Sequence, residues 1–183
     1  MNNDEDSIWF AMRVTYRREL IAQRLLDEQG IENYIPKKYV RDSKHPRKKI
    51  LAPVIHNLLF VHTTPSEMRR LKSEDSIPFM QYMMDMRSGS KIIVPDEQMR
   101  QFIAVTADYD ETLLYFKPGE LNLSKGTRVR VTGGPMEGRE GVFIKVKGAR
   151  DRRLVIEIEG IIAVAKALVH PDLVQALDNQ LGT

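Results

Sequence analysis

Hydrophobic positions in the first thirty residues change from a strand period to a helix period. Residues 8–15 (IWFAMRVT) are rich in β-forming side chains and loosely alternate between apolar and polar positions. Residues 16–30 (YRRELIAQRLLDEQG) repeat their apolar positions on one helical face and end at Gly30, a residue typical of helix termini. This pattern predicts a strand followed by a helix.

The same alternation of strand and helix patterns continues to residue 106. Residues 31–40 (IENYIPKKYV) and 54–63 (VIHNLLFVHT) predict two strands, and Pro36 places the first at an edge or a bulge. Thr64 to Glu67 (TPSE) forms a capping box with Pro65 at the first helical position, which predicts a helix from there. Residues 79–86 and the KIIV segment predict further strands, and a last helix follows Pro95.

Two strand–helix–strand units with an antiparallel hairpin between them are typical of a ferredoxin-like α/β sandwich. Residues 108–124 break this pattern with acidic residues followed by KPGELNLSKG, and we interpret them as a linker. Beyond it, GTRVRVTGG, REGVFIKVKG, RRLVIEIEG and IIAVAKALV each predict a short strand, which together favour a small SH3-like β-barrel. The sequence thus predicts an α+β protein with domains at residues 1–107 and 125–178.

Composition agrees with a globular protein of this size. The chain has 183 residues, of which 42% are hydrophobic and 29% charged, and it contains no run of about 18 apolar residues. The first ten residues (MNNDEDSIWF) are acidic, so we expect neither a secretory signal nor membrane association. Because cysteine is absent, disulfides, zinc thiolate sites and cysteine nucleophiles are excluded. We expect a cytoplasmic, nucleoid-associated monomer.

Positive charge is concentrated in one segment. Residues 37–49 carry seven Lys or Arg and one acid, Asp42, which gives this segment a charge of +6. The pattern predicts a basic hairpin over residues 37–52, which binds nucleic acid or is a solvated loop. The predicted contact residues within it are Arg41, Lys44, Arg47, Lys48 and Lys49.

Residues for catalysis do not converge in the sequence. The four histidines are scattered, and although His56 and His62 share a strand, no further metal ligands lie near them. The segment GGPMEGREG lacks the spacing of a phosphate-binding loop and joins two predicted strands, so we interpret it as a turn. We therefore expect no enzyme activity, no metal and no cofactor.

The segment GTRVRVTGGPMEGREGVFIKVKG resembles a KOW motif. In the first half, WFAMRV, NLLFVHT, PFM and IIVP resemble the NusG N-terminal domain of transcription elongation factors in order and spacing, and YFKPGE before the barrel agrees with this. The resemblance covers residues 9 to about 177. The general elongation factor usually has a PGYVLV-like strand where this chain has IHNLLFV, which is more similar to the specialised UpxY and RfaH-like antiterminators.

The resemblance implies that the N-terminal domain binds the clamp helices of RNA polymerase and bridges its DNA cleft. It places the contact on four apolar residues, Leu58, Phe60, Phe79 and Ile93. Within the strand, Leu58 and Phe60 share one face, and Leu59 and Val61 share the other. Core packing of these residues is the alternative interpretation.

The resemblance also implies nucleic-acid contacts and a second protein partner. Arg69, Arg70 and Lys72 are placed near non-template DNA, and the basic hairpin near upstream DNA or the polymerase gate. The barrel is expected to recruit the termination factor Rho or a small-subunit ribosomal protein through an exposed Met136. The implied function is antitermination at specific operons, such as those for capsular polysaccharide; the alternative is a KOW-containing ribosome- or RNA-binding module.

Overall fold

The structure is a computed structural model that describes residues 6–168 and 172–177. The ends of the predicted domains at residues 1–5 and 178, and residues 169–171, lie outside the described residues. The chain divides into two compact units, Met1–Met99 and Arg100–Thr183. Both mix strands with few helices.

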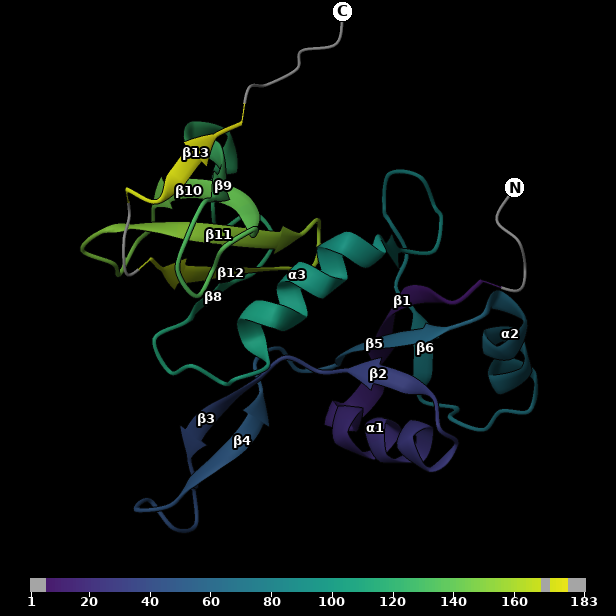
Figure 1. Cartoon of the computed structure of the whole chain (residues 1–183). Helices are drawn as coiled ribbons and strands as arrows, with labels where there is room; N and C mark the ends of the chain where they lie inside the picture. Colours follow the sequence, from purple (N-terminus) through teal and green to yellow (C-terminus); the bar gives the residue numbers. More distant parts are fainter. Residues whose placement is uncertain (1–5, 169–171, 178–183) are drawn as a thin grey trace, which may run out of the picture. The chain divides into compact units, whose positions relative to one another are not determined.

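The N-terminal unit is built on a sheet in which neighbouring strands are antiparallel, in the order β2-β5-β1-β6, with β7 also pairing with β1 (Figure 1). Helices α1 and α2 connect its strands, and the chain then enters α3. The elements in chain order are β1 (Ile8–Val14), α1 (Glu19–Glu28), β2 (Glu32–Tyr34), β3 (Lys37–Arg41), β4 (Lys49–Pro53), β5 (Leu58–Thr63), α2 (Pro65–Ser73), β6 (Met80–Tyr82), β7 (Ile93–Val94) and α3 (Asp96–Thr106).

Local signals explain where the helices begin and end. The Thr64 hydroxyl accepts a hydrogen bond from the Glu67 backbone N–H at 3.1 Å, which confirms the predicted cap of α2. Gly30 has a φ of +69°, so it ends α1 in a left-handed conformation that suits glycine. A short 3₁₀ turn at Thr15–Arg17 joins β1 to α1.

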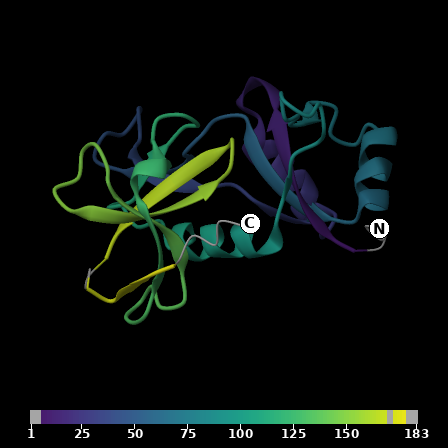
Figure 2. The ribbon, with the colours of Figure 1, turned by 90° about the horizontal axis from the view of Figure 1, so that it is seen from above.

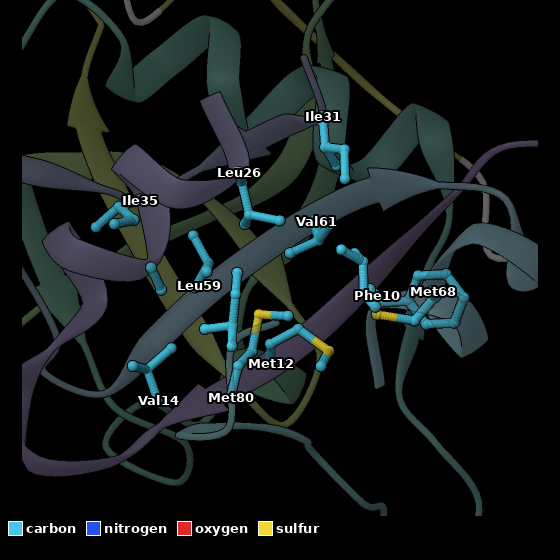
Figure 3. Packing of buried hydrophobic residues seen from close by; sticks show 13 residues of the cluster. Phe10, Met12, Val14, Leu26, Ile31, Ile35, Leu59, Val61, Met68 and Met80 are labelled. Carbon is cyan, nitrogen blue, oxygen red and sulfur yellow. The ribbon is translucent and has the colours of Figure 1, made fainter. Parts of the chain in front are cut away.

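Apolar residues from one face of the sheet form the main core of this unit with α1 and α2. Figure 3 shows β-strand residues such as Met12, Leu59 and Val61 pointing toward one another and toward Leu26 of α1. Met68 and Leu71 of α2 belong to the same cluster. The predicted alternation of β5 is therefore confirmed for Leu59 and Val61.

The C-terminal unit contains a six-stranded antiparallel sheet in the order β13-β9-β10-β11-β12-β8. The strands of this sheet are visible in the green and yellow part of the ribbon seen from above (Figure 2). Its elements are β8 (Leu114–Phe116), a 3₁₀ turn (Leu123–Lys125), β9 (Thr127–Val131), β10 (Glu140–Lys145), β11 (Arg152–Ile158), β12 (Ile162–Ala167) and β13 (Val174–Ala176).

Strand β8 corrects the predicted linker of residues 108–124. It pairs with β12, and Leu114 and Phe116 pack against a cluster that contains Val155 and Ala165. Leu121 and Leu123 pack against the same cluster. The Pro and Gly residues suggested a free connection, but the apolar side chains around them attach most of the segment to the C-terminal unit.

Candidate functional site

The face of the N-terminal sheet opposite α1 and α2 carries a second set of apolar residues. In the β1–β5 ladder, Ala11 lies opposite Phe60 and Trp9 opposite His62, and directly opposed residues share a face. Leu58 and Phe60 are 2% and 0% exposed, and neither belongs to the cluster with α1 and α2. Both residues are therefore buried on the opposite face, as the strand alternation predicts.

The structure does not bring the four predicted polymerase-contact residues together. Phe79 packs against the cluster on the α1–α2 side, and the Arg18 guanidinium lies 4.1 Å from the centre of its ring. Ile93 lies opposite Phe10 in the β1–β7 ladder, on that same side, and is 38% exposed. Of these four residues, only Leu58 and Phe60 lie on the second face. The face on which a side chain lies depends on how its strand pairs in the sheet, which the sequence alone does not show.

A polar group lies at one edge of this second face. His62 stacks on Trp9, with 4.7 Å between ring centres and 16° between ring planes. Its Nδ1 atom lies 2.6 Å from Glu32 Oε2, and about a quarter of the His62 side chain is exposed. The carboxylate and the imidazole can therefore form an ion pair whenever His62 is protonated.

The basic segment forms a separate two-stranded ladder of β3 and β4, as predicted. Figure 1 shows this basic hairpin extending away from the β2-β5-β1-β6 sheet. Tyr39 pairs with Leu51 and Arg41 with Lys49, so two cations and two apolar side chains share one face. At the tip, Asp42 Oδ1 accepts the Lys44 backbone N–H at 2.8 Å. The predicted cations Lys44, Arg47, Lys48 and Lys49 are all exposed.

The predicted basic contact residues of α2 interact with neighbouring groups of the same unit. Arg70 donates hydrogen bonds to Glu67 and Glu74, and these carboxylates raise the pKa of its guanidinium. The Lys72 ammonium donates to the Met80 carbonyl at 2.6 Å. Arg69 is exposed on the same helix. The predicted contact residues of α2 thus lie on one helix, and Arg70 and Lys72 make hydrogen bonds to other groups of the same unit.

The turn between β1 and α1 carries three candidate residues that sequence reasoning missed. Tyr16 is 84% exposed, and Tyr16 and Arg17 have φ angles of +58° and +54°, which are rare for bulky residues. The Arg18 guanidinium lies over the rings of both Tyr16 and Phe79, 5.3 Å and 4.1 Å from their centres. An exposed ring beside arginines can stack on a base and contact phosphate. The run YRR was the available signal, but it was read as the start of the helix.

Asn57 holds this turn against the end of the basic hairpin. Its carbonyl accepts the Val14 backbone N–H and its side-chain oxygen accepts the Arg17 backbone N–H, both at 2.9 Å. Asn57 itself has a φ of +66°. The buried Glu19, the first residue of α1, places Oε1 3.0 Å from His56 Nδ1. These contacts fix the spacing between the β1–α1 turn and the chain leaving β4.

Met136 corrects the expectation of an exposed loop tip. It is 7% exposed and lines a cavity of about 220 Å³ in the C-terminal unit. The turn folds inward because Gly134 and Gly138 take φ angles near +79° and the Gly138 N–H donates to the Val131 carbonyl at 2.8 Å. Met136 can therefore contact a partner only from inside this cavity.

Within the described part of the chain, no three His, Cys, Asp or Glu side chains are placed to hold a metal ion. Among these residues there is also no helix with the length and apolar character needed to cross a membrane.

Comparison with known proteins adds a family match. A family model described as "Transcription termination factor nusG" matches residues 7–103. A search of curated proteins finds no match. A solved structure titled "Domain interaction in Thermotoga maritima NusG" is similar to this chain with a TM-score of 0.49 and 16% sequence identity, covering 96% of this chain and all of that one.

Proposed function

The chain belongs to the NusG family of transcription factors, and on this basis we propose that it binds RNA polymerase and promotes processive elongation. The observation that carries the proposal is the family match over residues 7–103, which spans β1 to the middle of α3. We further propose that it is a specialised UpxY/RfaH-like antiterminator of particular operons, such as those for capsular polysaccharide. The IHNLLFV segment supports this assignment.

Finer features of the fold are consistent with this proposal. The strand order β2-β5-β1-β6, with α1 and α2 packed on one face, supports a ferredoxin-like sandwich. The antiparallel six-stranded sheet of the C-terminal unit supports an SH3-like KOW barrel. We propose that these are the two functional modules of the protein.

The N-terminal unit is proposed to bind the clamp helices of polymerase through Leu58 and Phe60 on the second face of its sheet and through the exposed Ile93 on the α1–α2 side. Trp9, Ala11, Leu58 and Phe60 supply apolar area on the second face, but Leu58 and Phe60 are buried. Direct contact through them therefore requires this face to become accessible. Ile93 is the exposed member of the proposed set, whereas Phe79 packs against the α1–α2 cluster.

Nucleic acid is proposed to bind the basic hairpin and the exposed surface near α2. The hairpin's exposed cations would neutralise phosphates of upstream DNA, which adds affinity without sequence recognition. Arg69, Arg70 and Lys72 of α2 and the Tyr16–Arg18 turn would contact the non-template strand, and contact through Arg70 or Lys72 requires exchange of the hydrogen bonds that they make to Glu74 and to the Met80 carbonyl. The C-terminal unit is proposed to recruit Rho or a small-subunit ribosomal protein.

Co-purification with core RNA polymerase tests the proposed function. Phe60→Asp places a charge in a fully buried site and unfolds the unit, so the informative variant is Ile93→Asp. Ile21→Asp in α1 is the matched control, because Ile21 is 42% exposed and Ile93 38%. We expect the wild type and Ile21→Asp to bind polymerase and Ile93→Asp to bind more weakly.

Transcription through an intrinsic terminator then separates antitermination from binding alone. The expected result is more read-through product with the wild type than without it, and less with Ile93→Asp. Failure of the folded wild type to bind polymerase would overturn the proposed function. Binding without any change in read-through would overturn the antiterminator assignment and keep polymerase binding.

A further inference from the structure

The hairpin of β10 and β11 ends in a cluster of positive charge. Residues 145–152 (KVKGARDR), which we call the β10–β11 tip, contain four cations and one carboxylate, so the segment carries a net charge of +3. The cations are Lys145, Lys147, Arg150 and Arg152, and all four are exposed, as is the single acid, Asp151. The C-terminal unit therefore has a basic surface of its own.

Apolar packing and backbone geometry order this turn. Val146 is buried, and Ala149 packs against the apolar cluster to which Val146 belongs. The Ala149 N–H donates to the Val146 carbonyl at 3.3 Å, and Gly148 supplies a φ of +86°. Lys145 lies opposite Arg152 in the β10–β11 ladder, so their side chains share a face and lie close together. The fold therefore holds like charges next to each other.

The charge of the tip is not neutralised by its surroundings. Within residues 6–168 and 172–177, none of the four cations makes a hydrogen bond or an ion pair. An acidic segment approaches the tip, because the Thr112 carbonyl accepts a hydrogen bond from Arg153, the residue after the tip. The net charge is still +2 when the charged residues around this contact are included, namely Asp108, Asp110, Glu111, Arg153 and Lys166. Since like charges opposite each other in a sheet repel, a bound anion would relieve this repulsion.

The exposed chemistry of the tip suits a phosphate backbone better than a protein surface. Its exposed side chains are all charged, whereas its two apolar side chains, Val146 and Ala149, pack inward. Protein interfaces have an apolar or aromatic centre, but nucleic acids are bound largely through Lys and Arg contacts to phosphate. The tip also contains no aromatic side chain, so it has no platform on which a base could stack.

We propose that the β10–β11 tip is a nucleic-acid site that binds the phosphodiester backbone of RNA or DNA without recognising its sequence. Contacts from Lys and Arg to phosphates fix the position of a strand but carry no sequence information. The proposed function assigns nucleic acid to the N-terminal unit and protein recruitment to the C-terminal unit. This inference goes beyond it and does not depend on it.

Lysine footprinting of the full chain tests the proposal at the level of single residues. The acetylation rate of each lysine with N-hydroxysuccinimidyl acetate is measured by mass spectrometry, with and without a nucleic-acid probe. The probes are oligouridylate RNA and oligothymidylate DNA, each of twelve nucleotides. We expect either probe to slow the acetylation of Lys145 and Lys147 by about fivefold, because a phosphate then occupies the ammonium groups.

Lys117 is the matched control position in the same unit. It is exposed and follows Phe116, which pairs with Ala163 near the start of β12. Arg153, beside the tip, pairs with Ala167 at the end of β12. Lys117 therefore lies beside the opposite end of this strand, and its acetylation rate should not change when a probe is added.

A charge reversal provides the second measurement. Arg150→Glu should raise the RNA concentration that half-protects Lys147 by about fivefold, because one phosphate contact is lost. Lys117→Glu makes the same change of charge at the control position and should leave this concentration unchanged. In the wild type, half-protection of Lys147 should require more RNA as salt increases, since phosphate binding releases counterions.

Three results would overturn the proposal. One is no protection of Lys145 and Lys147, or protection by only one of the two probes, because the shared backbone is then not what binds. Another is an equal effect of Arg150→Glu and Lys117→Glu, because binding then follows the net charge of the unit rather than the tip. The third is equal protection by an oligoglutamate peptide of the same charge, because an acidic protein segment would then fit the tip as well as nucleic acid does.

These outcomes are separable from those of the proposed function. Protection of Lys48 reports on the basic hairpin of the N-terminal unit, and co-purification reports on polymerase binding. Absence of protection at Lys147, with Lys48 protection and co-purification intact, removes this inference alone. Failed co-purification removes the proposed function and leaves the footprint at Lys147 as a separate result.

Discussion

At the scale of single residues, Asn57 combines a strained backbone with two hydrogen bonds. Its φ of +66° is one that Asn tolerates better than most residues, and its side chain accepts the Arg17 N–H. This explains how the chain departs from the PGYVLV-like pattern at this point: the position needs a left-handed residue, and Asn meets that need while also bracing the β1–α1 turn.

We expect Asn57→Ala to lower the free energy of unfolding of the N-terminal unit by about 2 kcal/mol. About half of this comes from the left-handed conformation and half from the lost hydrogen bond to Arg17. Asn57→Gly loses only the hydrogen bond, so its cost should be about 1 kcal/mol. Urea unfolding measures both variants, and equal costs would show that backbone conformation is unimportant here.

Tyr16 should matter for binding more than for stability. Its ring is 84% exposed, so Tyr16→Ala should change the free energy of unfolding little, while removal of a stacked base contact costs about 1–3 kcal/mol of affinity. Fluorescence anisotropy with a single-stranded DNA oligonucleotide at fixed salt measures this. Tyr16→Phe keeps the ring and should bind like the wild type, and unchanged affinity in Tyr16→Ala would exclude stacking at this turn.

At the scale of elements, local sequence signals were sufficient for caps and strand faces but not for pairing between distant segments. Thr64 caps α2 as predicted, and Leu59 and Val61 face the helices as the alternation requires. Phe79 and Ile93 were expected to lie in one patch with Leu58 and Phe60, but both lie on the α1–α2 side, and the side of Ile93 follows from its pairing with β1, far away in sequence. Strand β8 was missed because its partner, β12, lies about fifty residues later.

The segment before β8 is attached to the C-terminal unit by charge as well as by packing. Asp110 accepts hydrogen bonds from the Thr112 backbone N–H and hydroxyl at 2.8 and 2.7 Å and lies near Lys166. The Arg153 guanidinium also donates to the Thr112 carbonyl at 2.8 Å. This segment is therefore an ordered part of the C-terminal unit, and its attachment should depend on pH.

The pH dependence follows from the pKa of Asp110. The Thr112 hydroxyl, the Thr112 N–H and Lys166 hold this pKa below its ordinary value of 3.8, so the folded state prefers the ionised carboxylate. The resulting stabilisation is present above pH of about 4 and is lost as pH falls through the lowered pKa. Asp110→Asn should therefore destabilise the unit at pH 7 but not at about pH 2, as measured by urea unfolding. Equal destabilisation by Asp110→Asn at both pH values would show that the loss of an oxygen atom, rather than the loss of the charge, causes the destabilisation.

At the scale of the whole molecule, the sequence predicted an N-terminal domain that ends at residue 107, whereas the chain divides into compact units between Met99 and Arg100, so most of α3 belongs to the C-terminal unit. The sequence alone could not predict which side chains become buried or form internal contacts when the chain folds. Met136 appeared to be an exposed tip because glycines surround it, yet those glycines turn it into a cavity. Arg70 and Lys72 appeared to be available cations, yet nearby carboxylates and a carbonyl engage them.

The division into two units predicts that a disturbance in one unit leaves the other folded. A Cβ atom at Gly141 would lie 2.4 Å from the Val155 carbonyl oxygen, and because backbone cannot move aside easily, Gly141→Ala should destabilise the C-terminal unit by about 3 kcal/mol. Gly133→Ala is the control, since its Cβ would meet only the end of the Leu173 side chain. Hydrogen exchange should show faster exchange in β9 to β12 of Gly141→Ala and unchanged protection in β1 and β5. Equal loss of protection in both units would mean that the chain unfolds as one cooperative body, and destabilisation of either unit would then unfold the other as well.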